Sequence, residues 1–123
     1  MNTSNHGQMF DLSYLNQIFQ GNQEMINNII QLFLEQVPQY IEEMVECVNQ
    51  NDLISLHPLA HKAKSSIAML GLKSIEQQVF QIEQDSKQHQ NFEQLPNLVL
   101  DVKSECDLVY EQLRGVLTGS SAA

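Results

Sequence analysis

Apolar side chains recur every three or four residues along almost the whole of this 123-residue chain. The clearest run lies between Met25 and Val48, where the spacing matches one face of an α-helix rather than the alternation of a β-strand. Hairpin signals are missing, because no pair of turn residues separates two alternating apolar runs. The chain is long enough for one domain and leaves little room for a second. The pattern therefore predicts an all-α fold.

Five segments carry the helical spacing, with approximate limits at residues 12–20, 22–49, 52–70, 74–87 and 96–117. Pro38 lies inside the second segment, and because the spacing resumes in phase after it, we expect one bent helix rather than two. The third helix begins at a cap from either Asp52 or Ser55. With Ser55 as the cap, Pro58 falls in the first turn; with Asp52 the helix must bend at Pro58.

Short links between the long helices favour antiparallel neighbours. We therefore expect an antiparallel up-down four-helix bundle with a short extra N-terminal helix, together spanning residues 10–117. The polar residues 1–9 and the small residues 118–123 are expected to be disordered tails. Cys47 and Cys106 lie on apolar stripes, which predicts buried free thiols.

The charge balance excludes several classes of partner. The 15 acidic and 6 basic side chains give a formal net charge of −9, which disfavours nucleic acid and anionic membranes as partners. No apolar run approaches the ~20 residues of a membrane span, and residues 1–9 lack the basic and apolar pattern of a signal peptide. We therefore expect a cytoplasmic protein.

The third predicted helix has a face that is unusual for a solvated helix. At about 100° per residue, His61 lies about 160° from the centre of the core stripe and so faces solvent. Small or basic side chains surround it, namely His57, Lys64, Ser65 and Ala68. No Asp or Glu occurs in the 23 residues from Leu53 to Ile75, which predicts an acid-free setting that an anion can approach. An exposed imidazole is a competent nucleophile near neutral pH, and Lys64 at i+3 can reach a group carried on the ring.

Other kinds of site fit this face less well. His57 and His61 have the i, i+4 spacing of a zinc-binding helix, but further ligands are absent nearby in the sequence, so no metal site is expected. Hydrolytic catalysis lacks a nucleophile–base–orienter set, paired acids beside His61 and a Gly-rich phosphate loop. A helical adaptor that binds a signalling partner through the same face, without phosphorylation, is the main alternative.

Residues 60–71, AHKAKSSIAMLG, resemble the signature of histidine-containing phosphotransfer (HPt) domains, approximately A-H-x-L-K-G-S-[SA]-x-x-[LI]-G. The upstream run FLEQVP, residues 33–38, is similar to the family's helix before the histidine, proline included. The resemblance covers about residues 10–117 in helix order and length. The chain departs from the signature at Ser65, where the family usually has Gly, and at Ala63, where it usually has Leu.

The resemblance implies a phosphoryl carrier without kinase or phosphatase activity of its own. His61 matches the phosphoacceptor, and Lys64 matches the lysine that supports the phosphoryl oxygens. Gly71 matches the glycine that ends the helix. Gly71 and Pro38 are the two residues expected to have a structural role. The implied partners are a response-regulator receiver domain and a histidine kinase, and the receiver would supply Mg²⁺, so no cofactor is expected on this chain. We expect the protein to be a monomer, because a monomer suits a carrier that diffuses between partners. The expected partner-binding residues surround the histidine and are His57, Lys62, Ser65, Ala68, Met69 and Leu72.

Overall fold

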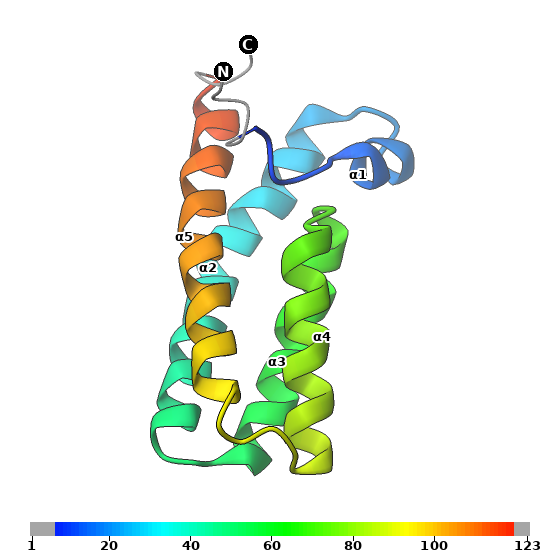
Figure 1. Ribbon diagram of the computed structural model, residues 1–123. Coiled ribbons are helices and arrows are strands. Elements are labelled where there is room, and N and C mark those ends of the chain that lie inside the picture. The colour runs from blue at the N-terminus through cyan, green and yellow to red at the C-terminus, as the bar shows by residue number, and fades with distance from the viewer. Residues whose placement is uncertain (1–6, 120–123) are drawn as a thin grey trace.

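The computed structural model describes residues 7–119, which form five α-helices and no strand. These are α1 (Ser13–Ile18), α2 (Gln23–Asn49), α3 (Leu53–Met69), α4 (Lys73–Gln88) and α5 (Leu95–Thr118). The four long helices alternate in direction, with α2 and α4 each packed against both α3 and α5 (Figure 1). The expected all-α up-down bundle with a short N-terminal helix is therefore confirmed.

Side-chain caps fix where α2 and α3 begin. Asn22 Oδ1 accepts a hydrogen bond from the backbone N–H of Met25 at 3.2 Å, as expected for the N-cap of α2. Asp52 Oδ1 accepts from the backbone N–H of Ser55 at 3.1 Å. Asp52 is thus the cap of α3, which decides between the two alternatives and places Pro58 inside the helix.

The expected start of α4 at Ser74 is wrong. The helix begins at Lys73 and follows the turn at Gly71 almost at once, so Ser74 lies in its first turn. There the carbonyl of Ser74 accepts a hydrogen bond from the Gln78 side chain at 3.3 Å, and its side chain caps no helix.

All five helices contribute apolar side chains to one core. Among the largest fully buried side chains are Leu15, Ile26, Ile30, Met44, Leu56, Ile67, Ile75, Ile82 and Leu113. Cys47 and Cys106 are free and buried, as expected, and burial is the main cause that raises the pKa of Cys106 to about 12. Within residues 7–119, none of the helices is both long and apolar enough to cross a bilayer.

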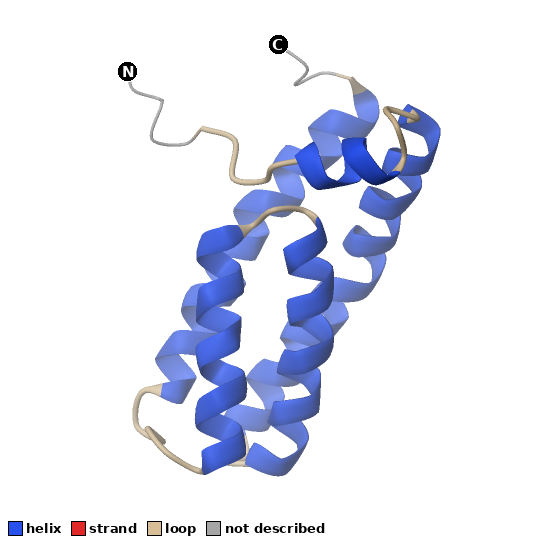
Figure 2. Cartoon of the chain, turned by 90° about the vertical axis from the view of Figure 1, so that its right-hand side faces the viewer, coloured by secondary structure: helices blue, strands red, loops and turns tan. Residues whose placement is uncertain are grey.

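The connection between α3 and α4 is closed by α1 and the segment before it, which lie across the top of these two helices (Figure 2). The backbone N–H of Asp11 donates to the carbonyl of Leu70 at 2.8 Å. Gly71 adopts φ +65°, and a Cβ there would lie 2.6 Å from the carbonyl oxygen of Asp11. Gly71 therefore ends α3 and also leaves room for the N-terminal segment to cross the turn.

Both ends of the chain run beyond the described residues. Of the tail expected over residues 1–9, residues 1–6 lie outside the described part. Met9 donates its backbone N–H to Gln112 Oε1 at 2.9 Å, and Gln112 Nε2 donates to the carbonyl of Gly7 at 3.2 Å. At the other end α5 reaches Thr118, and residues 120–123 of the expected C-terminal tail lie outside the described part.

Gly71→Ala should destabilise the fold more than Gly21→Ala. Both glycines have positive φ, but an added Cβ at Gly21 meets nothing within 4 Å. Each substitution should cost about 1–2 kcal/mol for the left-handed backbone, and Gly71→Ala about 1–3 kcal/mol more for displacing Asp11. Urea unfolding of the two variants measures this difference, and equal losses of unfolding free energy would contradict the crowding at Gly71.

Candidate functional site

His61 lies on the outer surface of α3 and is held there by an acid from α4. Its side chain is 62% exposed, and its Nδ1 lies 2.7 Å from Oε2 of Glu83. The α3–α4 turn brings the two together, because His61 precedes Gly71 by ten residues and Glu83 follows it by twelve. The two residues thus stand at about the same level of an antiparallel helix pair.

The expected acid-free setting of His61 is wrong. The absence of Asp and Glu holds along α3 itself, but Glu83 reaches the histidine from the neighbouring helix. Its carboxylate is almost completely buried, with 6% of the residue exposed. The ring therefore has a negative partner on its inner side and solvent on its outer side.

Lys64 completes the contact from the other side of the same carboxylate. Its Nζ lies 2.8 Å from Oε1 of Glu83 and 5.2 Å from the centre of the Phe80 ring, which also belongs to α4. Oε1 has no hydrogen-bond partner of standard geometry among the described residues, so the ammonium charge is what compensates it. His57, half-buried one turn before His61, has its Nε2 3.8 Å from Oε2. The carboxylate of Glu83 thus lies within 4 Å of three basic side chains of α3, those of His57, His61 and Lys64.

These contacts determine the charge of Glu83 and the tautomer of His61. Burial by itself would raise the pKa of Glu83, but the close contacts and charges of Lys64 and His61 outweigh it and hold that pKa below its ordinary value. Glu83 is therefore ionised near neutral pH and can only accept hydrogen bonds. Nδ1 of His61 must then carry the proton, and in the neutral ring the lone pair is on Nε2.

Of the six expected partner-binding residues, His57 is half-buried beside Glu83, and the other five divide into three groups. Lys62, Ser65 and Ala68 are exposed around His61. Met69 is half-buried and lines a small pocket between α3 and α2 that also includes Leu32. Leu72 is a correction: only 1% of it is exposed, because it packs into the core directly before α4. It is therefore not available as a contact for a partner.

The sequence predicts a structural role for Pro38 and no metal site. Pro38 is half-buried, and α2 continues through it without a break. In the part of the chain that the structure describes, no group of three or more His, Cys, Asp or Glu side chains is arranged to hold a metal ion.

Glu83 is the one residue of this site that the sequence analysis missed. On a helical wheel it lies about 40° from Val79, inside the apolar arc of α4. An acid at such a position signals a buried carboxylate that needs a cationic partner. The signal does not name the partner, because the facing residue depends on how α3 and α4 pack.

A comparison with protein-family models matches the Hpt domain over residues 28–115. The chain belongs to the Hpt domain family. No curated protein and no solved structure gave a match. In this Hpt domain the matched range contains all of α3 and α4, and hence His61, Lys64 and Glu83, whereas α1 lies outside it. Membership of the family suggests a role in histidine phosphotransfer.

Glu83→Ala should abolish the preference of His61 for the Nδ1–H tautomer. Without a carboxylate at Nδ1, nothing in the described contacts fixes the proton there. Imidazole ¹⁵N chemical shifts of the wild type should show a protonated Nδ1 and a free Nε2, and the variant should show a mixture. Glu76→Ala removes a different acid of α4 and serves as the matched control. Identical shifts in the wild type and Glu83→Ala would contradict the assignment.

Proposed function

We propose that this Hpt domain carries a phosphoryl group on Nε2 of His61. It would accept the group from an aspartyl phosphate of a receiver domain or from a histidine kinase, and pass it to a response-regulator receiver in a two-component phosphorelay. The observation that carries the proposal is the 2.7 Å contact of Glu83 with Nδ1, on a ring whose other side is exposed.

The contact with Glu83 supports nucleophilic attack without a separate base. Nε2 uses its lone pair to form the bond to phosphorus, and the bond from phosphorus to the aspartyl oxygen breaks, which restores the aspartate carboxylate. No proton leaves Nε2, because that nitrogen carries none. The ring becomes a positively charged imidazolium that keeps its proton on Nδ1, and Glu83 stabilises that charge. The reverse sequence returns the phosphoryl group to the next aspartate.

Lys64 is proposed to support the phosphoryl oxygens. Its ammonium has three N–H donors, and the carboxylate of Glu83 lies against one side of it. The remaining donors can turn toward a group on His61, which lies one helical turn earlier on the same side. Because phosphoryl transfer depends mainly on positioning and charge neutralisation, a cation held in this place lowers the barrier.

The proposal also covers the partner proteins, the cofactor and the cellular location. The receiver would provide the acidic site and the Mg²⁺, and this chain would need no cofactor of its own. We propose a monomeric cytoplasmic carrier without autonomous kinase or phosphatase activity. The surface around His61, including Lys62, Ser65 and Ala68, would meet the receiver.

His61→Gln should eliminate phosphorylation. The protein is mixed with a phosphorylated receiver domain and Mg²⁺, and the wild type should become an acid-labile, base-stable phosphoprotein. His89→Gln replaces an exposed histidine elsewhere and should accept phosphate as the wild type does. If His61→Gln is phosphorylated as well as the wild type is, the proposal is wrong. If the wild type binds receivers but takes up no phosphate from any of them, the molecule is an adaptor instead.

A further inference from the structure

Lys64 contacts two residues of α4 that differ in chemistry. Its Nζ lies 2.8 Å from Oε1 of Glu83 and 5.2 Å from the centre of the Phe80 ring. Glu83 follows Phe80 by three residues, so both side chains lie on the face of α4 that meets α3. The ring of Phe80 is therefore part of the surroundings of the ammonium, although the transfer described above gives it no role.

The register of the two helices places the ring behind the ammonium as seen from His61. His61 and Glu83 stand at one level, and Lys64 and Phe80 each lie three residues nearer the α3–α4 connection. Helical side chains lean toward the N-terminus of their own helix. The ammonium of Lys64 accordingly reaches back to the level of Glu83, and the ring lies on the side of the ammonium that is turned away from His61.

An aromatic ring suits this place better than a second acid would. The face of a phenyl ring attracts a cation within about 6 Å of its centre, but the ring carries no net charge. A second carboxylate would attract the ammonium more strongly, and it would also repel an incoming phosphoryl group. The ring therefore restrains Lys64 and leaves the N–H donors of the ammonium available to phosphoryl oxygens.

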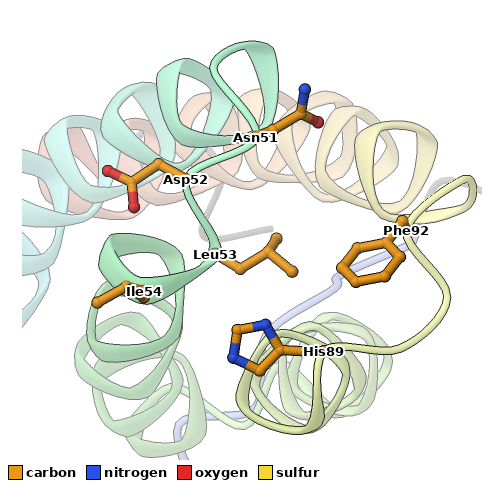
Figure 3. Close-up of a pocket in the computed structure, with 6 residues that line it drawn as sticks. All are labelled: Asn51, Asp52, Leu53, Ile54, His89 and Phe92. Carbon is orange, nitrogen blue, oxygen red and sulfur yellow. The ribbon is translucent and has the colours of Figure 1, made fainter.

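Exposure alone does not give a phenylalanine this role, and Phe92 provides the comparison. Phe92 is 57% exposed and Phe80 is 48% exposed. Figure 3 shows the ring of Phe92 beside Leu53, at the end of the bundle where the α2–α3 and α4–α5 connections meet. None of the described residues that line this pocket is a lysine or an arginine. Phe92 is thus a matched control, since its ring is similarly exposed but has no cation in its pocket.

We propose that Phe80 is a positioning residue for phosphoryl transfer at His61 and that it acts through the ammonium of Lys64. This inference rests on the proposed function. The ring restricts the lysine to side-chain conformations in which the ammonium stays beside Glu83 and within reach of a group on His61. Without the ring, fewer molecules hold the ammonium in place when the phosphoryl group of the receiver arrives, and transfer slows.

Transfer kinetics test this role. The probe is the phosphorylated receiver domain that transfers fastest to the wild type in a panel, with Mg²⁺, in single-turnover measurements. Phe80→Leu keeps an apolar side chain and removes the ring. It should lower the rate at saturating receiver about two- to fivefold, the range expected for one exposed cation–π contact, with the half-saturating concentration unchanged. Phe80→Tyr keeps the ring face and should restore the rate, and Phe92→Leu should match the wild type.

A double-mutant comparison tests whether Phe80 acts through Lys64. In a Lys64→Ala background, Phe80→Leu should slow the transfer no further, because the ammonium on which the ring acts is absent. A further slowing of the same size would overturn the proposal. A change confined to the half-saturating concentration would overturn it as well, since the ring would then be a contact for the receiver.

NMR of the unphosphorylated protein provides a measurement that does not depend on transfer. The ring current should shift the Hε protons of Lys64 upfield in the wild type, in Phe80→Tyr and in Phe92→Leu, whereas Phe80→Leu should lose the shift. Circular dichroism verifies that each variant is folded. If the wild type lacks the shift while phosphate still reaches His61, the inference is wrong and the proposed function stands. If no receiver transfers phosphate to the wild type, the proposed function fails, and the inference fails with it even where the shift is present.

Discussion

The carboxylate of Glu83 is the point on which the site depends. A carboxylate buried at the boundary of an apolar core is costly unless it is paired, and here the ring of His61 and the ammonium of Lys64 occupy its two oxygens. The side chain of His61 is 62% exposed and that of Lys64 is 26% exposed, so losing either partner should cost less than about 3–5 kcal/mol, the range typical of a fully buried pair. The pairing therefore ties α3 to α4 and fixes the orientation of the histidine at the same time.

The same pairing connects the fold to the proposed chemistry. Gly71 allows a tight turn, the turn brings the levels of His61 and Glu83 together, and Glu83 places the proton of the ring on Nδ1. In the proposed transfer, the exposed Nε2 would then be a nucleophile that needs no base. Lys64 neutralises the buried carboxylate in the unphosphorylated protein and is positioned to neutralise a phosphoryl group as well. One set of contacts would thus serve both the stability of the fold and the proposed transfer.

Much of the fold could be predicted from the sequence, because helical spacing and caps are local properties. Asn22 begins α2 as expected, whereas Ser74 does not begin α4, because the turn at Gly71 leads directly into Lys73. The position of His61 on the solvent face followed from periodicity on its own helix. Glu83 did not follow, because its contact with His61 depends on how two helices pack. Leu72 was misplaced for the same reason: packing at the α3–α4 turn buries it.

The nitrogen that bears the phosphoryl group tests the account most directly. The contact at Nδ1 leaves only Nε2 available, so the phosphorylated protein should contain Nε2-phosphohistidine at position 61. Phosphorus–nitrogen couplings and imidazole ¹⁵N shifts of the ¹⁵N-labelled phosphoprotein distinguish the two isomers. Coupling of phosphorus to Nε2, with a proton retained on Nδ1, is the predicted result. A phosphoryl group on Nδ1 would contradict the account, since the contact with Glu83 could not then exist.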